Sequence, residues 1–248
     1  MNDINKRIKP IFLLADSQLL FYKSELGLFL GRIKKLLFEE SNENEIKAAY
    51  IGASNNDDVR FYEIFEMAMQ QIDIRNCQMI KSEPDIKDNN FLQSADIILL
   101  AGGDTYKGWN VINRNGWDEI ITERYFQGAI LIGVSAGAVQ LGEKGYQSDF
   151  ENEEKEASFD TLQLAPFIID VHANDDWNNL SKQVKLGEGQ LKGYGIPYGA
   201  GIIYYPDMSI EAVRFSCTEI VISGDDVLKS IILPPNEKKE EIRKEQAV

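Results

Sequence analysis

The sequence predicts an α/β fold: a mostly parallel central sheet with helices on both faces and a short β-rich C-terminal part. Up to about residue 160, short and nearly continuous apolar runs alternate with longer amphipathic stretches, which is typical of parallel strands covered on both faces. Beyond that point, Gly-rich turns separate short β-type runs. Of the 248 residues, 44% are hydrophobic, which is enough for one domain over residues 1–236 with a substantial core.

Five buried-type strands are expected first, because five apolar runs lie between turn-forming residues. These runs cover residues 9–15, 47–53, 77–80, 96–100 and 129–134. Apolar residues at helical spacing predict helices over residues 19–40, 61–72 and 117–126. Later runs predict strands at residues 167–171, 201–205, 212–215 and 219–222, and a helix at 177–185. Residues 237–248 hold four acidic and four basic residues and are predicted to form a disordered tail.

The net charge of −14, from 26 basic and 40 acidic residues, limits the partners. Nucleic-acid backbones and anionic membranes attract clustered Lys and Arg, so neither is an expected partner. The apolar run at residues 10–15 is too short for a signal-peptide core. The two cysteines, Cys77 and Cys217, form no Cys/His cluster, so no metal site is expected. These features predict a cytoplasmic protein with reduced thiols.

Residues 133–137 read GVSAG and follow a buried run. This is the G-x-S-x-G pattern of a nucleophile elbow, a tight strand-to-helix turn that exposes a serine hydroxyl. The glycines allow the turn, and the N–H of the next residue, Ala136, can then bind a developing oxyanion. A Gly-rich turn that merely packs closely gives the same pattern. Because a strand is expected directly before it, we interpret Ser135 as a candidate nucleophile.

A second turn, Gly102-Gly103-Asp104, follows the run at residues 96–100 in the same way. Parallel strands end at one edge of a sheet, where open α/β folds bind their ligands. A glycine in this turn would let the backbone approach a reacting carbonyl closely and supply a second oxyanion N–H. Gly102 and Asp104 are then candidate substrate-binding residues. In the alternative interpretation, Asp104 is only the N-cap of a helix.

His172 is the single histidine of the chain and ends the apolar run at residues 167–171. Any mechanism that needs an imidazole base must therefore use it. Isolated histidines are often structural, but this one is expected at a strand end that converges with those of the two turns. We interpret His172 as the general base for Ser135.

Four stretches resemble the peptidase E and cyanophycinase family of serine peptidases, and they occur in that family's order. They are YIGAS at residues 50–54, LLAGGDT at 99–105, IGVSAGA at 132–138 and LAPFIIDVH at 164–172. The resemblance covers roughly residues 9 to 215, and it implies a fold related to class I glutamine amidotransferases.

The resemblance also implies the roles of the site residues. Ser135 would be the nucleophile, His172 the base, and Gly103 and Ala136 the donors of the oxyanion hole. The protein would be a serine-type exopeptidase or dipeptidase-like hydrolase that cleaves a short peptide or isopeptide bond through an acyl-enzyme. Known relatives favour aspartyl substrates, and no cofactor is implied.

The chain departs from the family pattern in two places. Relatives carry an acid between the serine and the histidine, and the family's spacing places it on Phe150 here. We choose the neighbouring Asp149 as the orienting acid, with Glu151 next. Where relatives usually carry an acidic pair after Gly-Ile or Gly-Leu, residues 195–198 read GIPY, so the substrate pocket is expected to differ.

Two other functions stay open. The displaced acid is compatible with a catalytically weak or inactive family member that binds a peptide or amino-acid ligand. The same site could also carry out acyl transfer or ester hydrolysis. The expected partner is a small peptide, and the sequence leaves open whether the protein is a monomer or a homodimer.

Overall fold

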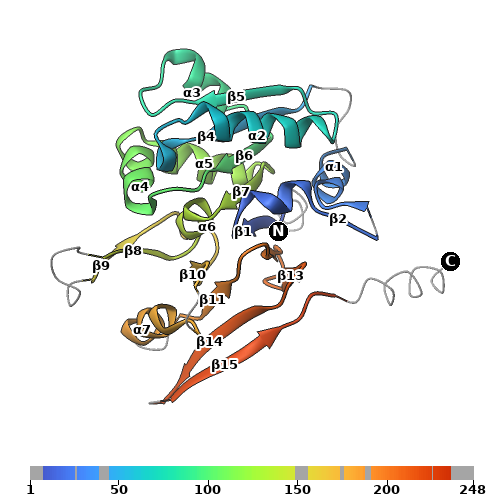
Figure 1. The fold of residues 1–248 in the computed structure, drawn as a ribbon. Coiled ribbons are helices and arrows are strands. Elements are labelled where there is room, and N and C mark those ends of the chain that lie inside the picture. Colours follow the sequence, from blue (N-terminus) through green and yellow to red (C-terminus); the bar gives the residue numbers. More distant parts are fainter. Residues whose placement is uncertain are drawn as a thin grey trace.

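A seven-stranded sheet forms the centre of the computed structural model, in the order β13-β12-β1-β7-β6-β4-β5 (Figure 1). The structure describes residues 8–25, 27–38, 45–148, 156–173, 176–187, 191–224 and 226–235. The strands of this sheet are β1 (Ile11–Leu14), β4 (Lys47–Ile51), β5 (Asn76–Ile80), β6 (Ile97–Leu100), β7 (Ile130–Val134), β12 (Gly201–Tyr204) and β13 (Ile210–Val213). β1, β7, β6, β4 and β5 run parallel to one another. β12 is antiparallel to β1, and β13 is antiparallel to β12. The mostly parallel sheet predicted from the sequence is therefore confirmed.

Helices cover both faces of this sheet. Phe12 and Leu14 of β1 belong to a core cluster with α1 (Leu30–Phe38) and α2 (Val59–Gln70). Ile11 and Leu13 point to the other face and belong to a cluster with four further helices. These are α3 (Ile86–Leu92), α4 (Thr105–Arg114), α5 (Trp117–Phe126) and α6 (Ala136–Leu141). Since both faces are buried, the strands read as continuous apolar runs.

The helix predicted over residues 19–40 was wrong in its first half. A 3-10 helix, η1 (Ser17–Phe21), comes first, followed by the short strands β2 (Lys23–Ser24) and β3 (Gly27–Leu28), and only then α1. Tyr22 ends η1 in an extended conformation. β2 and β3 are antiparallel, so the chain reverses between them, and Gly27 at the start of β3 has a φ of 110°, which glycine adopts readily. The apolar spacing was correct for α1 but did not reveal this reversal.

A second sheet carries the β-rich C-terminal part, in the order β10-β11-β14-β15, and lies below the central sheet in Figure 1. Its strands are β10 (Ile168–Val171), β11 (Gly193–Ile196), β14 (Cys217–Ser223) and β15 (Asp226–Ile232). Trp177, Leu180 and Val184 pack the region of α7 (Asn178–Leu186) onto this sheet. A hairpin of β8 (Lys144–Ser148) and β9 (Glu156–Asp160) precedes β10. The predicted tail at residues 237–248 lies outside the described residues.

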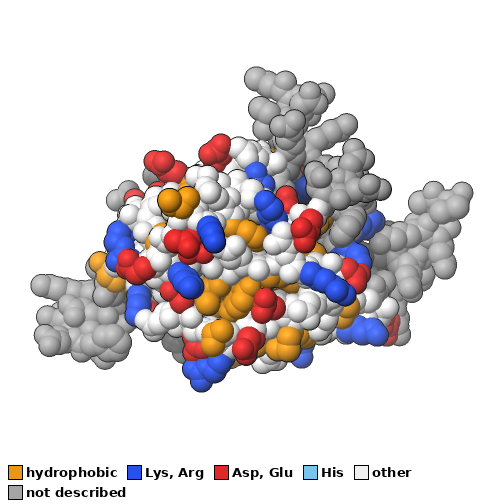
Figure 2. Space-filling model, turned by 90° about the horizontal axis from the view of Figure 1, so that it is seen from above, with side chains coloured by type: hydrophobic (Ala, Val, Ile, Leu, Met, Phe, Trp, Pro, Cys, Tyr) orange, Lys and Arg blue, Asp and Glu red, His pale blue; other side chains and the backbone are white. Residues whose placement is uncertain are grey.

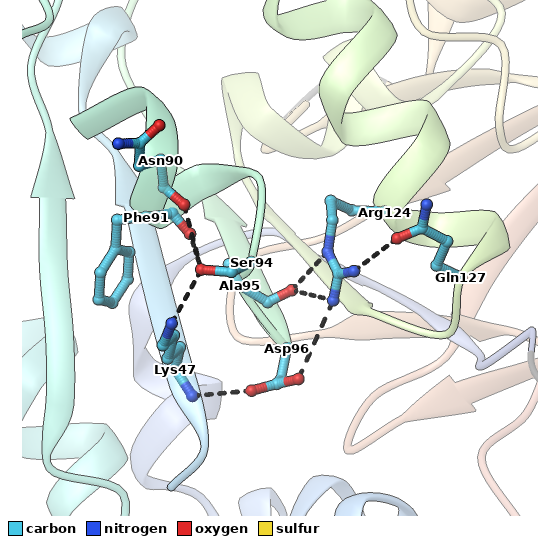
Figure 3. A network of polar contacts seen from close by, with 8 residues as sticks. All are labelled: Lys47, Asn90, Phe91, Ser94, Ala95, Asp96, Arg124 and Gln127. Atoms are coloured by element: carbon cyan, nitrogen blue, oxygen red, sulfur yellow. Dashed lines mark hydrogen bonds and ion pairs between the residues drawn. The ribbon is translucent and has the colours of Figure 1, made fainter. Parts of the chain in front are cut away.

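A polar network joins α5 to the amino ends of β4 and β6 (Figure 3). Arg124 donates from Nε and Nη2 to the carbonyl oxygen of Ala95, at 3.0 and 2.8 Å. Asp96 accepts the backbone N–H of Lys47 at 2.9 Å, and its carboxylate lies 3.9 Å from Arg124 Nη2. These contacts join α5 to the starts of β4 and β6.

The surface seen from above Figure 1 carries charges of both signs, with apolar side chains between them (Figure 2). In the described part of the chain, none of the helices combines the length and hydrophobicity that crossing a membrane requires.

Candidate active site

The carboxyl ends of the parallel strands bring the candidate residues together at one edge of the sheet. Leu14 of β1 pairs with Val134 of β7, and Leu100 of β6 pairs with Gly133. The residues directly after these strands therefore lie close to one another. They line a pocket of about 250 Å³ that includes Ser135 and His172.

Ser135 occupies a strained turn between β7 and α6, with φ 51° and ψ −112°. Its backbone N–H donates to Leu14 O at 2.8 Å, which fixes the turn to the neighbouring strand. A Cβ atom on Gly137 would lie 2.0 Å from Leu100 O, and one on Gly133 would lie 2.6 Å from the backbone of Ala138. Both glycines are therefore required by close packing. This is the strand–turn–helix context of a nucleophile elbow.

The Gly102–Gly103 turn lies directly against Ser135. A Cβ atom on Gly102 would be 3.2 Å from Ser135 Cβ, and one on Gly103 would be 2.1 Å from Ser54 O. Gly103 also has a φ of 138°, which a side chain would disfavour. Among the described residues, the N–H groups of Gly103 and Ala136 have no hydrogen-bond partner, so both are free to bind an oxygen atom.

Asp104 has the role given by the alternative interpretation. It is the N-cap of α4, and its carboxylate accepts the N–H of Lys107 at 2.9 Å. Its own N–H donates to Ser54 O at 2.8 Å. The pocket is lined by Gly102 and Gly103 but not by Asp104.

His172 reaches the pocket from the second sheet, where it directly follows β10. Its backbone N–H donates to Ile196 O at 3.1 Å, and its φ is 69°. The ring nitrogen Nε2 contacts the carbonyl oxygen of Ala15. Because a carbonyl oxygen can only accept a hydrogen bond, this contact assigns the proton of the neutral ring to Nε2 and the lone pair to Nδ1.

The sequence of this chain also matches a protein-family model. The model of peptidase family S51 matches residues 28–207, which is more than half of the chain. The chain belongs to peptidase family S51. This confirms the resemblance to peptidase E and cyanophycinase, and the family supports a peptidase function.

Two solved structures share the fold of this chain. A peptidase from an acI-B1 Actinobacterium has a TM-score of 0.57 at 14% identity, over 92% of this chain and 98% of that one. A proposed peptidase E from Listeria monocytogenes EGD-e has a TM-score of 0.53 at 21% identity, over 90% and 98%. At these identities the likeness shows the fold alone. No curated protein matches the chain.

Tyr198 covers the imidazole ring of this S51 member. The rings of His172 and Tyr198 are stacked, with centroids 4.2 Å apart and an interplanar angle of 6°. Tyr198 belongs to the GIPY segment that departs from the family pattern. The sequence indicated a changed pocket there, but gave no sign that the tyrosine would contact the histidine.

Asp16 fixes the turn that carries Tyr198. One carboxylate oxygen accepts the N–H of Gly199 at 2.6 Å, and the other accepts the N–H of Gln18 at 2.8 Å. Asp16 thus joins the end of β1 to the turn after β11. Sequence reasoning missed this residue, although an acid directly after a strand, at the edge that carries the site, was a usable signal.

Ser135 and His172, the candidate nucleophile and base, are not in hydrogen-bond contact. Within the described residues, Ser135 Oγ and the His172 ring share no hydrogen bond, and the ring faces Ala15 instead. The predicted orienting acids, Asp149 and Glu151, lie outside the described residues.

The two thiols of this S51 member are poor nucleophiles. Both cysteines are free. Burial raises the pKa of Cys217 to about 12, and burial together with the charge of Glu66 raises the pKa of Cys77 to about 11. Neither lines the pocket, so Ser135 is its best candidate nucleophile.

Proposed function

We propose that this S51 protein is a serine-type peptidase of the exopeptidase or dipeptidase kind, which cleaves short peptide or isopeptide bonds in the cytoplasm without a cofactor. The observation that carries the proposal is the strained elbow at Ser135, which shares one pocket with the only histidine. The structure of the site supports acyl transfer to a serine hydroxyl, because strain and close backbone packing are used there to expose that hydroxyl.

In the proposed mechanism, Ser135 Oγ attacks the scissile carbonyl carbon while His172 accepts the hydroxyl proton. The N–H groups of Gly103 and Ala136 bind the oxygen that becomes negative. The imidazolium then gives its proton to the leaving amine as the C–N bond breaks. Water then attacks the acyl carbon while His172 accepts its proton. His172 returns that proton to Ser135 Oγ as the ester C–O bond breaks.

Either the Ala15 carbonyl or an acid would hold the Nε2–H group of His172, because Nδ1 must accept the proton of Ser135. The Ala15 carbonyl already accepts Nε2–H and would stabilise the imidazolium ion. Asp149, with Glu151 next, remains our proposed acid. A neutral carbonyl is a weaker partner for a cation than a carboxylate is, so the protein needs the ring to be held by other contacts as well.

An organophosphorus probe tests the nucleophile. A fluorophosphonate should modify wild-type protein at Ser135. It should not modify Ser135→Ala or His172→Ala, because the labelling reaction needs both the serine hydroxyl and the imidazole that activates it. Ser17→Ala is the matched control, since Ser17 lines the same pocket and its loss should leave labelling unchanged. Mass spectrometry of the tryptic peptides locates the adduct. Absence of labelling in folded wild-type protein would contradict the proposal.

The second candidate function is a weak or inactive S51 member that binds an amino-acid or peptide ligand. The observation in its favour is that His172 contacts Ala15 rather than Ser135. This candidate predicts saturable ligand binding without adduct formation, so the labelling experiment separates the two.

Tyr198 is proposed as a positioning residue for His172. Tyr198→Ala should lower kcat by about 10-fold with little change in KM, because the stacked ring restricts the imidazole orientation. Tyr198→Phe keeps the ring and should retain most of kcat. Steady-state kinetics on any active substrate measure both values.

The control for Tyr198 uses the single histidine. In protein labelled with 15N-histidine, the only imidazole signals come from His172, and they report which nitrogen carries the proton. The Nε2–H form should dominate in wild type and in Tyr198→Phe. A Tyr198→Ala variant with unchanged kcat would show that the stacking has no positioning role.

A further inference from the structure

The pocket beside Ser135 has an apolar wall built from several parts of the chain. η1 and α2 contribute most of its large apolar side chains, and the ends of β4, β6 and β7 contribute others. Its apolar side chains include Leu20, Phe61, Ile64, Phe65 and Leu99. Leu20, Phe65 and Leu99 are buried, whereas Phe61 is 47% exposed and stands at the rim.

The polar side chains of this pocket offer no positive charge. Tyr50 accepts a hydrogen bond from Asn55 Nδ2 at 3.0 Å, and burial raises the Tyr50 pKa to about 12, so its hydroxyl stays neutral. Among the described residues that line the pocket, Asp16 carries the only formal charge apart from the titratable His172, and that charge is negative. A Lys or Arg is not found in this lining.

From these observations we infer that the pocket accepts an uncharged, apolar side chain on the acyl side of the scissile bond and discriminates against aspartate. The inference rests on the proposed function, because it places the scissile carbonyl between Gly103 and Ala136. An aspartyl carboxylate would lose its hydration without gaining a Lys or Arg partner, in a pocket whose lining includes Asp16, which is costly. An aliphatic or aromatic side chain would instead gain from burial against Leu20 and Phe65.

The size of the pocket agrees with this occupant. Its volume is about 250 Å³, and an apolar protein cavity of roughly 150 Å³ is enough to bind benzene. A leucine or phenylalanine side chain therefore fits. This preference differs from the aspartyl substrates that the family resemblance implied.

Aminoacyl arylamides with one common leaving group test the inference. kcat/KM for the leucyl and phenylalanyl compounds should exceed that for the α-aspartyl compound by about 10-fold or more. Phe61→Ala should lower kcat/KM for the phenylalanyl compound several-fold and leave the alanyl compound nearly unchanged. Phe126→Ala is the matched control, because Phe126 is similarly exposed at 51% and does not line the pocket.

Two results would overturn the inference: an aspartyl compound that is cleaved as fast as the leucyl one, or a Phe61→Ala variant whose kcat/KM for the phenylalanyl compound is unchanged. Fluorophosphonate labelling of the same sample reports separately on the proposed function. If Ser135 does not label, the pocket is tested without turnover by titrating leucinamide and aspartic acid α-amide against the NMR signals of His172. Tighter binding of the aspartyl amide would then reject the inference on its own.

Discussion

Replacing Ser135 by alanine should lower kcat by about 10⁴-fold or more on any peptide that the wild-type protein cleaves. The reason is that the acyl-enzyme cannot form without the hydroxyl, and the thiols of Cys77 and Cys217 are protonated and outside the pocket. The fold should persist, because the turn is held through the Ser135 backbone N–H and Leu14 O at 2.8 Å. Steady-state kinetics and thermal unfolding of the purified variant measure the two effects.

A double variant sharpens this result. His172→Ala alone should lower kcat by a comparable factor. The double variant Ser135→Ala, His172→Ala should have a kcat little lower than either single variant, since the effects of replacing residues that act as one unit are not additive. Losses that multiply in the double variant would mean that Ser135 and His172 act independently, and the proposed mechanism would then be wrong.

The elbow at Ser135 and the Gly-rich turn beside it were predictable, because a short stretch of sequence determines each of them. The elbow needs small residues on both sides of Ser135, and Gly133 and Gly137 supply them within five positions. The strand before it is buried on both faces, so its apolar run is continuous and easily recognised. The convergence of the two Gly-rich turns then follows, because parallel strands end at the same edge.

The contacts of His172 were not predictable in the same way. The chain reaches this residue through β10 of a second sheet, and its ring meets Ala15, which is 157 positions away in the sequence. The stacking on Tyr198 and the bonds from Asp16 to Gly199 depend on how the two sheets pack. Such contacts follow from tertiary structure, for which hydrophobic periodicity carries no signal. The antiparallel pair of β2 and β3 was missed because the apolar spacing read from residues 19–40 continued through it.

Gly137→Ala should destabilise the protein by about 3 kcal/mol and should also abolish most of the activity. The added Cβ would lie 2.0 Å from Leu100 O and 2.8 Å from Leu100 Cβ. Both contacts involve β6, which is buried and cannot move without disturbing β4 and β7. The helix α6 must therefore move away from the sheet, and Ser135 moves with it. Chemical denaturation measures the free energy of unfolding, and the rate of fluorophosphonate labelling measures the reactivity of Ser135.

Gly31→Ala separates this effect from the general cost of replacing a helical glycine. Gly31 lies in α1, and a Cβ atom there would meet nothing within 4 Å. This variant should be neutral or more stable by about 0.4–1 kcal/mol, because alanine lowers the entropy of the unfolded chain. If Gly137→Ala were as stable and as reactive as Gly31→Ala, α6 would not pack on β6 as closely as described. The close contact between strand and helix that exposes Ser135 would then lose its physical basis.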